Sequence, residues 1–412
     1  MDSIHGRAEQ IKTPAVNNQR NKYLLPVIII SQFAGTSLWF AGNAILPDLQ
    51  QALQLDTHAI SRITSAVQLG FITGTLFFAV LSVADRFSPS LIFFICCCLA
   101  ATTNAALAWL AGSEWTVLTM RFVTGFFLAG IYPVGMKIAA DWYETGLGRA
   151  LGYLVGALVL GTSFPYLLKT VGWQLPWKSV LVFTSAFALI GGILVKHFIG
   201  DGPHRKKGNG FHPSALVNIF RSRPFRAASI GYFGHMWELY TFWAFLPVLL
   251  TIYTEMHGYT FSIPLLAFVI IAAGSVSCVV GGYWARTAGS KKVAWYALLC
   301  SGCCCIAAPF MLGLSFPFFF LFVLVWSLSV IADSPQFSAL VAQRAAPQHK
   351  GTALTIVTCI GFSITIVSMI VFDELLHRTD FSPRSFIILA IGPVLGLLAL
   401  RSPNDRTHNL TT

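Results

Sequence analysis

The sequence predicts an all-α membrane protein with twelve transmembrane helices, arranged as two pseudo-symmetric bundles of six. Hydrophobic residues make up 55% of the chain and charged residues only 10%, and the mean hydropathy is +0.69. This composition is too apolar for an ordinary soluble domain. The apolar residues fall in runs of about 20, the length that a helix needs to cross a hydrocarbon core of about 30 Å. A long polar gap divides the runs into two equal groups.

Twelve apolar runs are expected to form the transmembrane helices. In chain order they cover residues 24–46, 61–82, 91–111, 116–140, 146–168, 178–198, 226–251, 261–285, 292–313, 316–340, 350–373 and 384–401. The polar gap predicts a cytoplasmic linker at 199–225, between an N-terminal six-helix bundle (24–198) and a C-terminal one (226–401). Barrel strands are excluded, because they would alternate in polarity over about 10 residues.

The polar segments predict the orientation. Residues 1–23 form a polar tail without a signal-peptide cleavage site, so we expect the first helix to be retained. With this tail inside, twenty Lys and Arg residues fall on the cytoplasmic side and five on the other, which is a strong positive-inside bias. We therefore expect both termini, including the tail 402–412, in the cytoplasm, and a multi-pass protein of the plasma membrane, the inner membrane in a bacterium.

Charge and cysteine content limit the partners. The formal net charge of +11 follows from this topology and from anionic lipid, so we expect the bilayer as a partner and no nucleic acid. All nine cysteines fall inside predicted helices, which argues against a disulfide framework. Consecutive cysteines on a helix point about 100° apart and cannot close on one ion. We expect no metal site, no cofactor and a monomer.

Matched segments indicate that the two bundles are duplicated. FAGTSLWFAGNAILP (33–47) is matched by FGHMWELYTFWAFLP (233–247), Pro133 is matched by Pro335, and GRAL is followed by GTAL 203 residues later. The other two offsets are 200 and 202 residues, so the three agree. Such repeats are how many transporters build a central site that opens to either side.

The chain resembles the major facilitator superfamily of secondary transporters over essentially its whole length. The loop SVADRFSPS is similar to that family's signature Gly-x-x-x-Asp-Arg-x-Gly-Arg/Lys, with Asp85 and Arg86 in register. It departs from the signature where Leu81 and Ser88 replace two glycines and where the trailing basic residue is absent. The resemblance implies that Asp85 and Arg86 help to lock conformational states.

Two further elements carry the resemblance. The segment RFVTGFFLAG resembles the Arg-x-x-x-Gly element of helix four through Arg121 and Gly125. The segment GYLVGALVLG resembles the glycine-rich antiporter element of helix five through Gly152, Gly156 and Gly161, although other residues replace its proline and one of its glycines. The resemblance implies that these three glycines take part in conformational gating.

Five ionisable residues of the predicted helices are selected as candidate functional residues, because burying a charge in a membrane helix costs about 2.5 to 3.5 kcal/mol. They are Arg121, Lys137, His235, Glu238 and Asp333. In the fold that the resemblance implies, helices one, four, seven and ten line a central cavity, and these residues lie on helices four, seven and ten. His235 and Glu238 share one helix face. A count at roughly 1.5 Å per residue places His235 and Asp333 at the same depth.

We expect Glu238 to be the main proton acceptor, with Asp333 as a second candidate and His235 tuning it, because a low-dielectric cavity favours a neutral carboxyl group. Arg121 is the expected partner of a negative group on the substrate, or alternatively a member of the proton relay. A polar stripe on helix one and aromatic or polar residues on helices seven and ten are the other candidates for substrate contact. These are Gln32, Thr36, Trp39, Asn43, Tyr232, Phe242 and Trp326.

Most of these candidates have a structural alternative. Arg121 is also suited to anchoring helix ends through backbone carbonyls. Lys137 and Asp141, four residues apart, form a plain helix ion pair in the simpler interpretation. A lone histidine such as His235 is commonly a packing residue, and aromatic residues such as Trp243 commonly face lipid or the core.

The expected function is secondary active transport of a small organic solute by alternating access, coupled to protons, with an anionic solute if Arg121 binds it. The alternatives are a proton-driven efflux antiporter for amphipathic drug-like compounds and an uncoupled facilitator. A membrane-embedded enzyme is disfavoured, because no HExxH or Cys/His chelating pattern accompanies His235 and Glu238. A transporter-like sensor would carry an added signalling domain. We therefore do not expect an enzyme.

Overall fold

The computed structural model describes residues 18–143, 147–171, 176–205, 219–346 and 349–401. The described residues form helices and connecting turns, with no strand among them. The helices of the N-terminal half are α1 (Asn18–Thr36), α2 (Ala41–Ala44), α3 (Leu46–Leu53), α4 (Ala59–Val80), α5 (Val83–Arg86), α6 (Pro89–Leu110), α7 (Glu114–Leu128), α8 (Tyr132–Trp142), α9 (Leu147–Val171), α10 (Lys178–Leu194) and the π-helix η1 (Val195–Ile199). Those of the C-terminal half are α12 (Arg223–His257), α13 (Ile263–Ala288), α14 (Ser290–Met311), α15 (Phe316–Ala332), α16 (Ser334–Arg344), α17 (Lys350–Arg378), the 3-10 helix η3 (Pro383–Ala390) and α18 (Ile391–Leu400).

The predicted class is confirmed, and eleven of the twelve predicted spans are shown as helices long enough to cross a membrane. Eleven helical stretches within the described residues are long and apolar enough to cross a membrane, and they match the second to twelfth predicted runs. The first run, 24–46, is interrupted, and only Tyr23–Thr36 of it forms a shorter apolar helix. The chain turns at residues 37–40 before α2 begins. Ser37 Oγ bonds the Ala34 carbonyl at 2.7 Å, which is the local hydrogen bonding that competes with a continuous helix.

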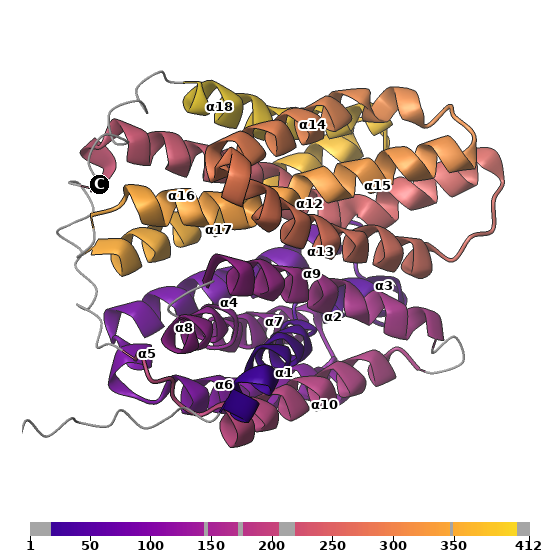
Figure 1. The fold of residues 1–412 in the computed structure, drawn as a ribbon. Helices are drawn as coiled ribbons and strands as arrows, with labels where there is room; N and C mark the ends of the chain where they lie inside the picture. The colour runs from indigo at the N-terminus through magenta and orange to yellow at the C-terminus, as the bar shows by residue number, and fades with distance from the viewer. Residues whose placement is uncertain (1–17, 144–146, 172–175, 206–218, 347–348, 402–412) are drawn as a thin grey trace, which may run out of the picture.

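The helices pack as two bundles side by side, with α1 to α10 in one and α12 to α18 in the other (Figure 1). The bundles meet through α4 against α17 and α9 against α13. On α9, a Cβ atom at Gly156 would lie 3.2 Å from the Ser275 carbonyl oxygen, and one at Gly152 would lie 3.6 Å from that of Cys278. Gly161 instead packs against the backbone of α1 in its own bundle. Two of the three predicted gating glycines therefore face the other half.

Corresponding spans of the two halves are broken at corresponding places. The span made of α7 and α8 is interrupted at residues 129–131, just before Pro133, and the span made of α15 and α16 at Asp333, just before Pro335. Each proline lies in the first turn of the second helix, where its missing N–H removes no intrahelical hydrogen bond.

The predicted linker and tails are only partly covered. η1 ends at Ile199 and α12 begins at Arg223, within the predicted linker, but residues 206–218 lie outside the described residues. The tail segments 1–17 and 402–412 lie outside them as well.

Candidate transport cavity and buried charges

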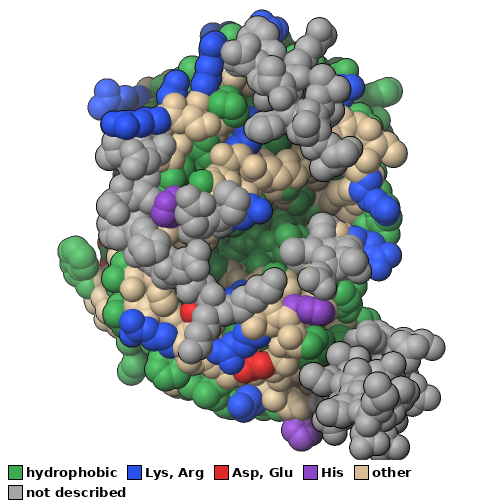
Figure 2. Space-filling model, turned by 60° about the vertical axis from the view of Figure 1, so that its left-hand side comes forward, with side chains coloured by type: hydrophobic (Ala, Val, Ile, Leu, Met, Phe, Trp, Pro, Cys, Tyr) green, Lys and Arg blue, Asp and Glu red, His purple; other side chains and the backbone are tan. Residues whose placement is uncertain are grey.

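A cavity of about 1450 Å³ lies between the two bundles. The N-terminal half lines it through α4, α5, α8 and α9, and the C-terminal half through α12, α13, α16 and α17. Figure 2 shows it as a hollow with hydrophobic side chains inside and Lys and Arg side chains around it. This face is the left-hand end of Figure 1, where α5 lies.

The charged side chains of the cavity are mainly basic. Among the described lining residues, four are basic, Lys137, Arg149, Arg286 and Lys350, and the single carboxylate is that of Asp85. Lys and Arg concentrated in a cleft with apolar walls create a positive potential that attracts anions. The arrangement can therefore bind a small solute that carries negative charge.

The predicted gating residues lie at this end of the molecule. Lys137 Nζ is 3.8 Å from Asp141 Oδ1, as the predicted ion pair requires, but it is closer to Asp85 Oδ1, at 3.1 Å. This contact joins α8 to α5 within the N-terminal half. Arg86, at the end of α5, is exposed. The state-locking role of Asp85 and Arg86 stays a prediction.

Arg121 is fully buried and does not line the cavity in this conformation. Its guanidinium donates to Asn104 Oδ1 at 3.0 Å and to the carbonyls of Leu38 and Trp39 at 2.9 and 2.5 Å. These carbonyls lie in the turn that interrupts the first span, where no helical N–H reaches them. Gly125, one turn along α7, allows close contact with the backbone of α4. The structure therefore shows Arg121 in the anchoring arrangement that was the alternative to substrate binding.

The polar stripe predicted on helix one is also packed away from the cavity. Thr36 Oγ1 donates to the Gln32 carbonyl at 2.8 Å, and Asn43 Nδ2 donates to Thr64 Oγ1 on α4 at 2.7 Å. Gln32 is buried, and its side-chain amide has no hydrogen-bond partner among the described residues. Trp39 is fully buried, so none of the four stripe residues contributes to the cavity lining in this conformation.

Trp39 nevertheless belongs to a group of aromatic side chains that closes the inner end of the cavity. Its ring centroid lies 4.8 Å from that of Phe71, 5.9 Å from that of Tyr240 and 5.6 Å from that of Phe362. These three neighbours come from both halves, and all of them line the cavity. Trp39 thus lies directly behind the lining.

His235 and Asp333 are in contact, which their equal predicted depth allows. His235 Nδ1 lies 2.8 Å from Asp333 Oδ1, and both side chains are almost completely buried. The contact has the distance of an ion pair without the alignment of a good hydrogen bond. Tyr232 and Ser334, which are near neighbours of the pair along the chain, line the cavity. The pair therefore lies immediately behind the cavity wall.

Glu238 faces a different set of partners, although it shares α12 with His235. It is fully buried and accepts hydrogen bonds from Ser301 Oγ at 2.8 Å, Trp326 Nε1 at 2.7 Å and Cys305 Sγ at 3.2 Å. The ring of Phe242 packs on Trp326 with centroids 4.5 Å apart. Glu238, Phe242 and Trp326 thus lie in the interior of the C-terminal half, and of the predicted substrate contacts only Tyr232 lines the cavity here.

The end of the molecule opposite the cavity mouth is held closed by contacts between α4 and α17. Thr365 Oγ1 donates to Gln68 Oε1 at 2.5 Å. Nearer the end, Ser61 Oγ donates to Asp373 Oδ2 at 2.6 Å, and His58 Nδ1 lies 3.0 Å from the same oxygen. At this end α4 and α17 are therefore in direct contact, whereas at the other end the cavity lies between the halves and α9 still contacts α13.

Sequence reasoning missed the partners of the buried charges. Asn104, Ser301 and Cys305 are small or neutral residues on neighbouring helices, and no local pattern distinguishes them. Asp373 was overlooked because it is the last residue of a predicted run. Its i, i+4 spacing to His377 was the available signal, because residues four apart share a helix face.

Comparisons with known proteins agree with this architecture. The family model described as Major Facilitator Superfamily matches residues 27–369. An uncharacterized protein of Campylobacter jejuni is 26% identical over 286 residues, which cover 68% of this chain and 86% of that protein. The probable sulfoacetate transporter SauU of Cupriavidus necator is 23% identical over 358 residues, covering 78% and 79%. The crystal structure of the human organic anion transporter MFSD10 superposes with a TM-score of 0.69 at 15% identity, covering 92% and 99%.

Proposed function

Since the chain belongs to the major facilitator superfamily of transporters, we propose that it moves a small organic anion across the membrane by alternating access. The observation that carries this proposal is the basic lining of the cavity between the halves. Each cation that faces a carboxylate or sulfonate group of the solute contributes to its binding, Lys137 as a partly buried charge and Arg149, Arg286 and Lys350 as exposed ones. The apolar remainder of the lining suits a solute with a carbon skeleton.

Two of the similar proteins support an anionic solute. One is named a probable sulfoacetate transporter and the other an organic anion transporter. The likeness to MFSD10 concerns the fold alone, so the chemical argument rests on Lys137, Arg149, Arg286 and Lys350 of this chain.

The conformation is inward-facing under the proposed orientation. The cavity opens at the end where α9 and α17 begin and α13 ends, and Arg149, Arg286 and Lys350 line it near these helix ends. The positive-inside bias places this end in the cytoplasm, together with both termini. A solute in this state exchanges with the cytoplasm, while the contacts between α4 and α17 close the other side.

We place proton coupling at His235 and Asp333. They lie behind the cavity wall and contact each other, so a proton that binds one of them changes the charge balance next to the solute. The sequence favoured Glu238 as the main acceptor, but its three donors lie inside the C-terminal half, away from the cavity lining. We therefore propose Asp333, and not Glu238, as the main proton acceptor.

Transport in proteoliposomes tests the proposal. Purified protein is reconstituted into vesicles that are loaded with short carboxylates and sulfonates, including sulfoacetate, or with neutral sugars as comparison solutes. Counterflow is then measured with and without a pH gradient. We expect saturable counterflow of an anion and its accumulation when a proton gradient is imposed. Anion counterflow without pH-driven accumulation would indicate an uncoupled facilitator, and pH-driven expulsion of amphipathic cations an efflux antiporter.

Charge removal tests the cavity assignment. Arg149→Gln and Arg286→Gln should each raise the KM for the anion by up to about fivefold, because both side chains are exposed and an exposed ion pair contributes about 0.2 to 1 kcal/mol. Lys178→Gln is the matched control, because Lys178 is an exposed cation that does not line the cavity. Counterflow of neutral sugars alone, with no anion transported, would overturn the proposal.

A further inference from the structure

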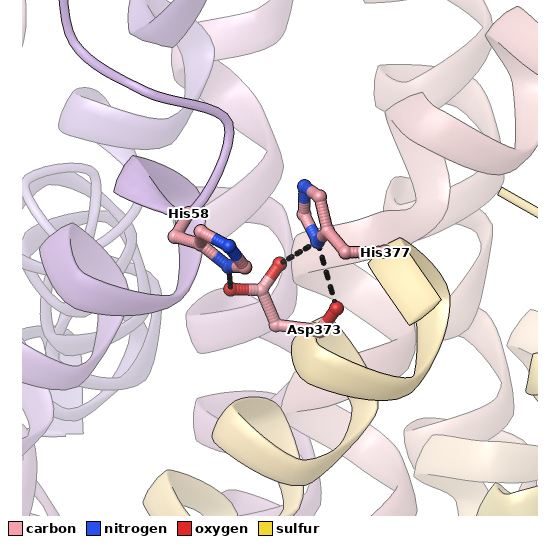
Figure 3. A group of neighbouring side chains, drawn as sticks. All are labelled: His58, Asp373 and His377. Atoms are coloured by element: carbon pink, nitrogen blue, oxygen red, sulfur yellow. Dashed lines mark hydrogen bonds and ion pairs between the residues drawn. The ribbon is translucent and has the colours of Figure 1, made fainter. Parts of the chain in front are cut away.

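At the closed end, two histidines and one carboxylate from different halves converge (Figure 3). His58 immediately precedes α4 in the N-terminal half, whereas Asp373 and His377 lie one turn apart near the end of α17 in the C-terminal half. Figure 3 shows the three side chains turned toward one another across the boundary between the halves. The cluster lies at the opposite end from the cavity mouth, and none of its members lines the cavity.

The distances within the cluster are short. His58 Nδ1 lies 3.0 Å from Asp373 Oδ2, and His377 Nδ1 lies 3.4 Å from Asp373 Oδ1. The two imidazole rings are also close, with centroids 4.0 Å apart. One potential ligand atom from each residue lies within 4.8 Å of the other two. Ligand atoms around a tetrahedral ion with bonds of about 2.0 to 2.1 Å lie about 3.3 to 3.4 Å apart, so small side-chain shifts suffice to close this set around one ion.

The chemistry of the cluster suits a divalent transition metal. Two imidazole nitrogens and one carboxylate oxygen are a zinc ligand set that leaves the fourth position to water. Asp373 and His377 have the i, i+4 spacing at which two ligands on one helix face reach the same ion. The Asp373 side chain is only 3% exposed, and its Oδ1 has no hydrogen-bond partner among the described residues. His58 is 37% exposed, which leaves solvent access to the cluster.

One contact inside the cluster has to change when an ion binds, because His377 Nδ1 lies 2.8 Å from the Asp373 backbone carbonyl and must release it to act as a ligand. The neighbouring side chains orient the ligands. Ser61 Oγ donates to Asp373 Oδ2 at 2.6 Å and holds the carboxylate in place. Asp56, two residues before His58, forms an ion pair with Arg62, with 2.6 Å between Arg62 Nη2 and Asp56 Oδ1. Asp56 Oδ1 also accepts a hydrogen bond from the backbone N–H of His58 at 3.0 Å, which fixes the turn that carries this histidine.

We propose that His58, Asp373 and His377 form a binding site for a divalent transition metal, with zinc as the representative ion, that clamps the two halves together at their closed end. An ion held by ligands from both halves binds only while those halves are in contact. By mass action it therefore favours the state in which this end is closed and the cavity end is open. The clamping effect rests on the proposed alternating access, whereas the binding site itself does not.

Direct binding is the first test. Zinc chloride is titrated into the purified full-length protein in detergent, and binding is followed by calorimetry at neutral pH. We expect one site whose affinity falls at least about tenfold in each of His58→Gln, Asp373→Asn and His377→Gln. His257→Gln is the matched control, since His257 lies at the end of α12 with Nδ1 bonded to the Tyr253 carbonyl, and it should bind zinc as the parent protein does.

The dependence on His58 alone is decisive, because this residue belongs to the other half. Asp373→Asn removes a buried hydrogen-bonded group and risks misfolding, whereas His58 is partly exposed and its replacement leaves Asp373 bonded to Ser61. Zinc binding that is unchanged in His58→Gln would overturn the shared site.

Transport is the second test. Zinc should inhibit counterflow in the parent protein, and His58→Gln should transport without zinc while requiring at least about tenfold more zinc for the same inhibition. If zinc binds at His58 but leaves counterflow unaffected, the proposed clamping effect is wrong and the proposed binding site stands. If no solute is transported at all, the proposed function fails, and calorimetry still decides the site.

Discussion

The two halves bury their strongest charges in different ways. Arg121 in the N-terminal half donates to one amide oxygen and two backbone carbonyls, groups that do not titrate. His235 in the C-terminal half contacts Asp333, a second ionisable group, directly behind the cavity wall. Burial is comparable, so the difference lies in the partners. A charge that pairs with carbonyls secures a break in a helix, whereas a charge that pairs with a carboxylate can exchange a proton.

The comparison predicts the largest effect for Arg121→Ala. This change leaves the carbonyls of Leu38 and Trp39 buried without their donor, and it should destabilise the fold by about 3 to 5 kcal/mol. The measurement is unfolding by SDS in mixed micelles, followed by circular dichroism. Arg121→Lys is the matched variant, because lysine keeps the charge but lacks the fork that reaches three acceptors, so an intermediate loss is expected. A stable Arg121→Ala with weakened anion binding would instead favour the substrate role.

Asp333→Asn should have the next largest effect, on coupling and not on folding. Asparagine keeps the shape and a contact to His235 but does not titrate, so exchange of solute should persist while accumulation driven by a pH gradient falls to the equilibrium level. The accumulation ratio in proteoliposomes measures this. Asp48→Asn is the control, since that carboxylate pairs with Lys169 outside the cavity lining. Full accumulation by Asp333→Asn would break the proposed distinction between the halves.

Glu238→Gln should have a smaller effect. The glutamine oxygen can accept from Trp326, and the Ser301 hydroxyl can turn to accept from the new amide, so we expect a loss of about 1 kcal/mol in stability. Accumulation should remain above that of Asp333→Asn in the same vesicles. The reverse order, with accumulation lost in Glu238→Gln and kept in Asp333→Asn, would make Glu238 the proton site that the sequence favoured.

The smallest effect is expected at the cavity mouth, where charges are partly exposed. Lys137→Gln removes the contact to Asp85 that is present in the open state, and such a pair contributes about 0.2 to 1 kcal/mol. A polar thiol reagent should therefore modify a cysteine introduced at Ser338, which lines the cavity, more slowly in Lys137→Gln than in the protein that keeps Lys137. The expected difference in rate is at most about fivefold. The comparison is made in a variant without the native cysteines, with Lys178→Gln as the control. Faster modification would contradict the stabilising role of this contact.

Most of the fold was predictable because hydrophobic length determines which segments can cross a bilayer. The second to twelfth spans needed only this information. The interruption after Thr36 was not predictable, because it depends on Arg121, which is 83 residues away from Leu38 in the chain. A hydropathy average over residues 24–46 predicts one continuous helix, because it depends only on neighbouring residues and not on a hydrogen-bond donor elsewhere in the chain.

Candidate residues were predictable where their type alone is unusual in a membrane helix. Five ionisable residues were found this way but Asp373 was not, and the equal depth predicted for His235 and Asp333 agrees with their contact. The direction of each side chain was harder to predict. Glu238 is three residues from His235, yet the packing of α14 and α15 directs it to Ser301 and Trp326, and only the assembled bundle determines that choice.

The interrupted first span also sets an order of events during biosynthesis. If the chain took the interrupted conformation as soon as α2 had been made, the carbonyls of Leu38 and Trp39 would have no donor inside a hydrocarbon environment, where an unsatisfied backbone group costs several kcal/mol. Their donor, Arg121, is translated 83 residues after Leu38. We therefore expect the first span to reach its interrupted conformation only after α7 has been made, so that the first and fourth spans take their final positions together.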